Sequence, residues 1–590
     1  MKLITYKLCL LLSISVSLIH AAGAQEYPRP GWQEQMSPLA SPDAYPGGEF
    51  SFWSGPFPKS FNYYLDTTVT SSRLFNLLFE KLLTVNGLTL EFEPGLAASW
   101  SVSGDRTTFE FRLDDRARWS DGVPVSARDV AWTYDAIMDP KNLTGPHKIA
   151  FERFYRPEVI DEKTIRFKAR EVHWKNLLSL GTFHVLPSHV FKDLDFNKIN
   201  FEFPVVSGPY SVESVREGIT LTLKRRAQWW QWVRASTRWI ANFDRLKFRF
   251  FAERENAFAE FKTGNLDYYP VYTASRWATE TTGAAYDNNW IIKQEVYNYN
   301  PIGFQGFAMN LRREKFADLR VRLALAHLLD RERMNQAIMH EAYFLHRCYF
   351  EDLYDGQTPC RGPEIRFDKD EARRLLEQAG WIVNRDTGLL EKDGQPFIIH
   401  FLTRSPTSDK FLAIYQEDLN DVGIQLEIVR KDWGAWIKDM DEFNFDMTWA
   451  AWSASLFKDP ESLWHSKEAD RAGGQNITGY KNAEIDAMID TLRTEFDIHK
   501  RHDIIRRIDT ILANDIPYVL LWNLNYRRLL YWNKFGAPET VLAKFLGEEG
   551  AYLFWWYDED SAADLEYARE TDEPLPGRDE TVVFDEVFQQ

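Results

Sequence analysis

The alternation of helix and strand over residues 368–429 constrains the fold of this chain more than any other feature. Asp368 or Asp370 can cap a helix that ends at Gly380. A tight turn at 393–394 precedes a strand-like run at 397–402, and a second helix-like run at 411–422 precedes another strand at 424–429. Helix and strand in this order need crossover connections, which produce parallel strand pairs. The sequence therefore predicts an α/β lobe.

An earlier stretch has a different pattern. Short alternating strands occur within 88–135 and 157–170, with one helix at 127–138, and they predict an α+β unit. The whole chain has 590 residues, which at ~150 residues a domain is enough for three to four domains.

The first 24 residues have the features of a secretory signal peptide. Lys2 and Lys7 precede an apolar run at 8–19, and Ala22-Gly23-Ala24 suits cleavage before Gln25. No later segment approaches the ~18 continuous apolar residues of a membrane span. We expect a mature chain of 25–590 that is exported in soluble form.

The charge of the chain excludes some partners. The formal net charge of −17 becomes −19 once Lys2 and Lys7 are removed, which disfavours binding to nucleic acid or to anionic membranes. Residues 557–590 carry twelve Asp and Glu against two Arg. We expect this acidic tail to be a solvated, partly disordered extension.

Two cysteines follow the signal peptide, Cys348 and Cys360, and the eleven residues between them are rich in turn formers. In an oxidising compartment a local disulfide is expected, and the alternative is two unpaired thiols.

Motifs for catalysis are absent from the sequence. There is no Gly-Lys-Ser or Gly-Lys-Thr of a phosphate-binding loop, no serine between glycines at nucleophile-elbow spacing, and no Cys/His cluster at metal-ligand spacing. We therefore expect no metal, no cofactor and no enzymatic activity.

A series of phrases over most of the mature chain resembles the family 5 extracellular solute-binding proteins of ABC importers. They occur in the family's order: Glu93-Pro94-Gly95-Leu96-Ala97-Ala98-Ser99-Trp100, Trp119-Ser120-Asp121-Gly122, Ser207-Gly208-Pro209-Tyr210, Phe261-Lys262-Thr263-Gly264-Asn265-Leu266-Asp267, Asp318-Leu319-Arg320-Val321-Arg322, Leu375-Leu376-Glu377-Gln378-Ala379-Gly380-Trp381 and Asp418-Leu419-Asn420-Asp421-Val422-Gly423-Ile424. Within the family, the region 452–464, the phrase 476–480 and the acidic tail look most like the Yej-type oligopeptide- and microcin-binding branch.

The resemblance implies a two-lobed periplasmic-binding-protein fold of the clamp-like class II, with an extra α+β subdomain in the first lobe. Lobe I would comprise 25–75, 205–305 and 525–590, the extra subdomain 76–204, and lobe II 306–524. Two crossings, near 300–310 and 520–526, would form the hinge.

The resemblance also implies a function. Such proteins capture peptides or peptide conjugates in the periplasm as monomers and deliver them to the membrane subunits of an ABC permease, which works with a cytoplasmic ATPase. Extended peptides can be held through main-chain hydrogen bonds, with aromatic walls beside them.

The candidate ligand wall follows a strand-like run at 445–447 and comprises Trp449, Trp452, Ser453 and Ser455. In peptide-binding relatives an Asp three residues after the tryptophan aligned with Trp452 anchors the α-amine of the ligand, and here Ser455 holds that position. Asp459 is a candidate substitute.

Further candidates in lobe I are Tyr63, Tyr64 and Trp53. Trp452 itself can either line the ligand or belong to the core.

Two other functions are compatible with the composition, which includes 22 Trp. One is an oligosaccharide receptor of the same fold, since tryptophan-rich clefts also stack sugars. The other is a secreted carbohydrate hydrolase, which turnover of a glycoside would reveal.

Overall fold

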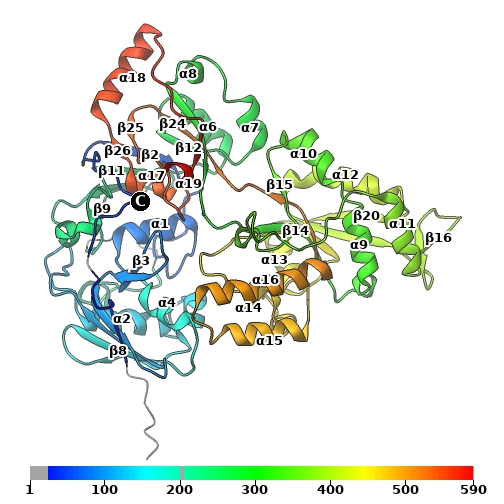
Figure 1. The fold of residues 1–590 in the computed structure, drawn as a ribbon, viewed down its shortest axis with the longest axis horizontal. Helices are drawn as coiled ribbons and strands as arrows, with labels where there is room; N and C mark the ends of the chain where they lie inside the picture. Colours follow the sequence, from blue (N-terminus) through cyan, green and yellow to red (C-terminus); the bar gives the residue numbers. More distant parts are fainter. Residues whose placement is uncertain (1–23, 33, 199–202, 204, 589–590) are drawn as a thin grey trace, which may run out of the picture.

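The computed structural model of the protein describes residues 24–32, 34–198, 203 and 205–588. The predicted signal peptide lies outside the described residues, apart from Ala24. Two lobes lie side by side and are joined by extended crossings (Figure 1). No helix in the described part of the chain is both long enough and apolar enough to cross a membrane.

Lobe I is built on an eight-stranded mixed sheet. Its strands, in spatial order, are β27 (Thr581–Val583), β13 (Ile291–Tyr297), β24 (Arg527–Trp532), β12 (Tyr268–Pro270), β2 (Glu49–Trp53), β11 (Arg245–Arg249), β10 (Thr220–Arg225) and β9 (Tyr210–Arg216). β2 pairs in parallel with β11 and β12, while β24 pairs antiparallel with both β12 and β13. Phenylalanines at alternate positions of β2, Phe50 and Phe52, point into the core because successive side chains of a strand face opposite sides of the sheet.

The helices of lobe I are short. They are α1 (Val69–Leu78), α6 (Arg254–Lys262), α7 (Ala274–Thr279), α8 (Ala284–Asp287), α17 (Glu549–Phe554), α18 (Glu559–Thr571) and α19 (Phe584–Val587).

The acidic tail is ordered, so the expectation of a partly disordered extension is wrong. Strand β27 pairs in parallel with β13 and so extends the lobe I sheet, and Val582 and Phe584 are buried. On α18, Leu565 and Ala568 are buried and give the helix an apolar side that packs on lobe I. The large number of acidic residues in the tail gave no indication of these few buried apolar side chains.

The extra subdomain has a five-stranded sheet of its own. The strand order is β1 (Gln25–Tyr27), β5 (Ala97–Val102), β6 (Thr108–Leu113), β8 (Thr164–Lys168) and β7 (Glu158–Val159), and helices α2 (Ala127–Met138), α3 (Gly145–Phe151), α4 (Lys175–Gly181) and α5 (Ser188–Phe191) accompany it. A hairpin of β3 (Leu83–Val85) and β4 (Phe92–Pro94) adjoins it. Because β1 pairs with β5, residues 25–27 belong to this sheet and not to the lobe I sheet, which corrects the predicted boundary.

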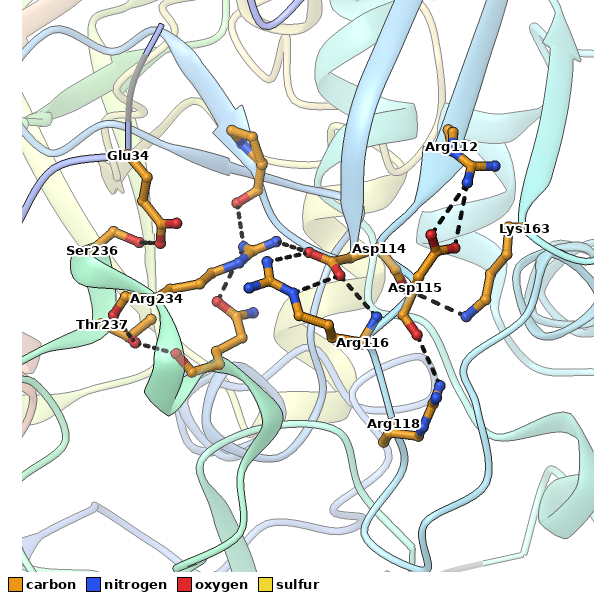
Figure 2. Close-up of polar contacts among 12 residues, drawn as sticks. Glu34, Arg112, Asp114, Asp115, Arg116, Arg118, Lys163, Arg234, Ser236 and Thr237 are labelled. Carbon is orange, nitrogen blue, oxygen red and sulfur yellow. Dashed lines mark hydrogen bonds and ion pairs between the residues drawn. The ribbon is translucent and has the colours of Figure 1, made fainter.

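A buried ion pair fixes the subdomain to lobe I. Arg234, from the lobe I segment after β10, donates through Nη2 to Oδ2 of Asp114 at 2.9 Å and through Nη1 to the carbonyl of Pro94 at 3.1 Å (Figure 2). Arg116 donates to the same carboxylate at 2.7 Å. Burial alone would raise the pKa of Asp114, but the hydrogen bonds from Arg116 and Arg234 outweigh it and hold that pKa well below its usual range. Subdomain and lobe I therefore form one body.

Lobe II is the predicted α/β unit. Its main sheet runs β20 (Gln425–Arg430), β19 (Ile398–Thr403), β21 (Met447–Trp452), β14 (Phe304–Met309) and β22 (Tyr518–Leu520). Its helices are α9 (Leu319–His327), α10 (Arg331–Met339), α11 (Lys369–Gln378), α12 (Asp409–Asn420), α13 (Trp433–Asp441), α14 (Glu461–Trp464), α15 (Ala483–Leu492) and α16 (Ile498–Asp515). β19 pairs in parallel with β20 and β21, so the prediction of parallel pairs is confirmed. Asp368, rather than Asp370, caps α11 by accepting from the backbone of 370 and 371.

Two crossings connect the lobes. One runs through residues 298–303 from β13 to β14, and the other through 524–526 from β23 (Trp522–Asn523) to β24. Gly303 ends the first crossing, and a Cβ there would lie 1.9 Å from the carbonyl oxygen of Trp452. Only glycine therefore lets this crossing approach β21 so closely.

Beside the first crossing, the structure joins Cys348 and Cys360 in a disulfide with a Cα–Cα distance of 6.3 Å. Next to it, the buried carboxylate of Asp509 on α16 accepts from the backbone N–H of Tyr349 at 2.8 Å and of Phe350 at 3.2 Å, and from the hydroxyl of Tyr354 at 3.0 Å. Burial raises the pKa of Asp509 to about 7, against the effect of these hydrogen bonds.

Candidate functional site: the cleft between the lobes

The strand pairings bring the carboxyl ends of several strands together at the edge of each lobe that meets the hinge. In lobe II, β19, β20 and β21 run in parallel, and the last residue of β21, Trp452, pairs with the first residue of β14, Phe304. In lobe I, β2, β11 and β12 run in parallel, and β12 ends beside the start of β24. The two edges therefore face each other across the crossings. Ligands of open α/β sheets bind outside the carboxyl ends of strands, so the region between these two edges, which we call the cleft, is the candidate site.

Trp449 and Trp452 on β21 both stand at the lobe II edge and are both half-buried. The indole N–H of Trp449 donates to Gln305 Oε1 at 3.0 Å, and that of Trp452 donates to the hydroxyl of Tyr518 at 3.1 Å. Both rings also pack against the lobe II core. The structure therefore anchors the polar atom of each tryptophan and leaves part of each ring accessible.

The segment after β21 contains the other predicted residues of this wall. Ser453 and Ser455 are exposed, and the structure gives neither hydroxyl a hydrogen-bond partner among the described residues. Asp459 forms an ion pair with Lys175 of the extra subdomain and accepts from the backbone N–H of Glu461 at 3.2 Å. The Asp459 carboxylate is thus already paired across the contact between the extra subdomain and lobe II. It is therefore not free to take the place of the acid that is missing at Ser455.

Sequence reasoning missed an arginine and two tryptophans at the same edge. Arg404 follows β19, and its guanidinium lies 4.9 Å from the ring centroid of Trp433 and 5.5 Å from that of Trp436. The two indoles stack with centroids 5.4 Å apart, and Trp433 is 58% exposed. No carboxylate of the described residues pairs with Arg404. The sequence did contain one indication of this arrangement. Asp432 can cap a helix directly after β20, which places Trp433 in the first turn of α13.

The lobe I edge carries a charged cluster. Arg73 donates to Glu548 at 2.8 Å and to Glu549 at 3.1 Å, and the hydroxyl of Tyr272 donates to Glu548 at 2.8 Å. Tyr272 follows β12, and its carbonyl accepts from the hydroxyl of Tyr343 in lobe II at 3.2 Å. Polar groups of lobe I thus reach the opposite lobe near the hinge.

The predicted lobe I residues have mainly structural contacts. Tyr64 is 2% exposed, and its hydroxyl donates to the carbonyl of His184, so its assignment to the ligand wall is wrong and it belongs to the core. Tyr63 is half-buried and packs edge-on against His147. Trp53 ends β2 at the cleft edge, where its N–H donates to the carbonyl of Phe251 at 3.0 Å.

A cavity of about 450 Å³ lies beside the hinge. It is lined from both lobes by the crossing residues Tyr297–Ile302, by Leu456 and Lys458 just after Ser455, and by Phe545 and Phe584 of lobe I. Lys458 is buried and pairs with Asp352, which also accepts from the backbone N–H of Ile302 at 3.1 Å. Lobe II thereby holds the first crossing directly.

Relatives of the chain are known. A Brucella suis protein named as a binding protein is 28% identical over 483 residues, which cover 76% of this chain and 78% of that protein. YejA of Agrobacterium fabrum, named a probable peptide-binding protein, is 25% identical over 585 residues, which cover 89% of this chain and 94% of that protein. The solved structure of the oligopeptide-binding protein AppA from Bacillus subtilis, in complex with a nonapeptide, superposes with a TM-score of 0.68 at 20% identity and covers 88% of this chain and 100% of that chain.

The structural similarity to AppA shows that this chain has the two-lobed fold predicted from the sequence. The sequence match to the description "bacterial extracellular solute-binding proteins, family 5 Middle" spans residues 91–474, which is more than half of the chain. The chain therefore belongs to the family 5 bacterial extracellular solute-binding proteins.

Proposed function

We propose that this protein captures peptides or peptide conjugates in the periplasm, as the substrate-binding protein of an ABC importer, and delivers them to the membrane permease and its cytoplasmic ATPase. One observation carries the proposal. The carboxyl edges of the two sheets face each other across a hinge, and the exposed Ser453 and Ser455 follow half-buried Trp452 there, directly after β21. An extended peptide can add to such a segment through main-chain hydrogen bonds. Family membership and the names of the relatives support the peptide class.

Arg404 is our candidate for the ligand's carboxylate. Its guanidinium is exposed and carries no ion pair among the described residues, and the rings of Trp433 and Trp436 flank it. A guanidinium binds carboxylate in a planar, two-bond geometry, so an unpaired arginine at the cleft edge suits a peptide C-terminus or an acidic side chain.

The first test is stoichiometric binding. Calorimetry with a defined peptide pool should show one peptide per protein and no peptide cleavage in the recovered sample. Trp452→Ala should weaken binding, whereas Trp32→Ala, which changes an exposed tryptophan of the N-terminal segment, should leave it unchanged. Trp452→Phe separates loss of the wall from loss of core packing, because it keeps a ring against the lobe II core. Cleavage of the peptides, or equal effects of the Trp452 and Trp32 variants, would contradict the proposal.

The second test concerns the ligand's amine. Because Ser455 replaces the anchoring acid and Asp459 is engaged by Lys175, we expect N-formylated and free-amine forms of one peptide to bind about equally. A buried carboxylate–ammonium pair would instead penalise the blocked form. A preference of ~100-fold for the free amine, or ~2.7 kcal/mol, would show that another acid anchors the amine.

The stacked pair of exposed Trp433 and half-buried Trp436 favours one alternative, an oligosaccharide receptor of the same fold, because flat indole faces also bind sugar rings. Saturable calorimetric binding of an oligosaccharide, with no binding of peptides, would favour this alternative.

A further inference from the structure

A second cavity, of about 730 Å³, lies in the seam between the extra subdomain and lobe II. Several contacts cross the seam: the backbone N–H of Trp174 donates to the carbonyl of Arg493 at 2.9 Å, Lys175 pairs with Asp459, and Phe92 stacks on Phe457 at 6.4 Å. Figure 1 shows α4 of the subdomain beside α14 and α16 of lobe II. None of the cleft residues discussed above lines this cavity, which shares only Leu90 with the cavity beside the hinge.

The walls of the seam cavity combine aromatic rings with charged side chains. The rings come from both bodies: Tyr27, Phe92, Phe109 and Trp174 from the subdomain, and Phe457 and Phe496 from lobe II. A cavity of this volume with such walls has the size and lining of a small-molecule site.

One wall of this cavity contains a buried charge without a counter-charge. Arg501, on α16, is 4% exposed and lies with its guanidinium 3.2 Å from the ring centroid of Trp174. Its Nη2 donates to the carbonyl of Lys458 at 2.7 Å, but its Nε has no partner, and no carboxylate of the described residues pairs with it. Burial lowers the pKa of Arg501 to about 10, with only a weak opposing effect of Glu495. A buried, unpaired charge is costly, and an anion from outside the chain would offset that cost.

Two further guanidinium groups line the same cavity. That of Arg106 lies 3.7 Å from the ring centroid of Phe496, and neither Arg106 nor Arg29 pairs with a carboxylate of the described residues. Glu26, Glu91 and Asp497 also line the cavity, although Asp497 is occupied as the cap of α16. The three acids equal the three arginines in number and repel a doubly charged group such as phosphate more strongly than a monoanion, so the cavity suits a ligand with a single negative charge placed against an arginine.

We propose that the seam cavity binds an aromatic carboxylate, a small molecule with one carboxylate on an aromatic body. The carboxylate would pair with Arg501 or Arg106, and the ring would lie against Trp174 and Phe496. Because the walls come from both bodies, the ligand binds only when subdomain and lobe II are in contact. It therefore stabilises the closed clamp by its difference in affinity for the closed and open forms. The proposal does not depend on what the cleft between the sheets binds.

The test uses N-acetyl-L-phenylalanine and its neutral amide as a matched pair, titrated calorimetrically into the ligand-free mature protein. We expect the carboxylate to bind one to one and about tenfold or more tighter than the amide, as for a hydrogen bond to a charged group. Arg501→Met should remove this difference, while Arg507→Met, which changes an exposed arginine of the same helix, should preserve it. Small-angle scattering should show compaction on addition of the carboxylate.

Two further measurements keep the proposal falsifiable. Arg106→Gln, at a half-buried position, replaces Arg501→Met if the latter melts far below the wild type, and it should also reduce the preference for the carboxylate. Trp452→Ala tests whether N-acetyl-L-phenylalanine binds in the seam cavity or in the cleft. Binding in the seam cavity should be unaffected by this change, because Trp452 lies in the cleft. Equal binding of carboxylate and amide, no effect of either arginine variant that folds, or loss of probe binding in Trp452→Ala would each overturn the proposal.

Discussion

At the scale of single residues, Asp509 links a buried charge to stability. Its carboxylate is completely buried and accepts hydrogen bonds from the backbone of 349 and 350, which are the neighbours of the disulfide at Cys348. Burial raises its pKa from 3.8 to about 7 in the folded protein. Between these values the folded state binds the proton more tightly than the unfolded chain, so this group's contribution to stability falls as pH rises through that window and is constant above it.

We predict that Asp509→Asn removes this pH dependence, because an amide does not titrate, although its single oxygen keeps only part of the hydrogen bonds that the two carboxylate oxygens accept. The free energy of unfolding of the variant, relative to wild type, should rise by about 4 kcal/mol between pH 3.8 and 7. Urea unfolding followed at several pH values measures it. Asp386→Asn, at an exposed loop position, is the control and should show no such trend. If the difference in the free energy of unfolding between variant and wild type does not change with pH, Asp509 is ionised in the folded protein.

The roles of individual residues in the cleft were harder to predict from the sequence than the fold. Trp452 and Ser455 could be located because the family phrases fix the end of one strand, and in the structure Trp452 is the last residue of β21 with Ser455 three residues beyond it, while their contact with a ligand stays a prediction. Tyr64 could not, because an aromatic after a strand looks the same whether its hydroxyl meets a ligand or the carbonyl of His184. Arg404 and Trp433 were missed because their proximity depends on two parallel strands ending side by side.

At the scale of elements, local patterns predicted the helices α11 and α12 and the strands β19 and β20 of lobe II, since caps, turns and glycine stops mark their ends. The acidic tail shows that composition alone does not predict whether a segment is ordered. Three strand residues and a few apolar side chains, among them Phe584, suffice to dock it on the sheet, and a charge count does not detect them.

We predict that Phe584→Ala destabilises lobe I by ~3–5 kcal/mol, because it leaves a cavity where α19 packs and loosens β27 at the edge of the sheet. Glu586→Ala, on the exposed side of the same helix, should change the melting temperature little. Thermal unfolding measured by calorimetry compares the two. Equal melting temperatures of the two variants would mean that the tail contributes no stability.

At the scale of the whole molecule, the extra subdomain contacts lobe II, and we predict that this contact helps to keep the clamp closed. The ion pair of Lys175 with Asp459 and the stacking of Arg501 on Trp174 are two of the contacts that join these bodies away from the hinge. The two-lobed architecture followed from the family resemblance, but this contact did not, because nothing in the sequence pairs residue 175 with residue 459.

We predict that Lys175→Met shifts the clamp toward the open form and speeds ligand release several-fold, since an ion pair that is half-buried contributes more than the ~0–1 kcal/mol of an exposed one. The radius of gyration of the ligand-free variant should increase. Lys168→Met, an exposed change in the same subdomain, is the control. An unchanged scattering profile and release rate would show that the pair does not hold the clamp closed.

The strand order of lobe I has a consequence for the synthesis of the protein. β24 lies between β13 and β12, and its residues come after the whole of lobe II in the chain. Until the ribosome has added residues 527–532, β13 has no partner in the lobe I sheet, because β27 also comes later in the chain, and β12 is an unpaired edge of the other five strands. The nascent chain must therefore carry an unfinished first lobe through most of translation. Its assembly is a post-translational event that awaits the last tenth or so of the polypeptide, whereas lobe II, which is nearly continuous in sequence, can form before it.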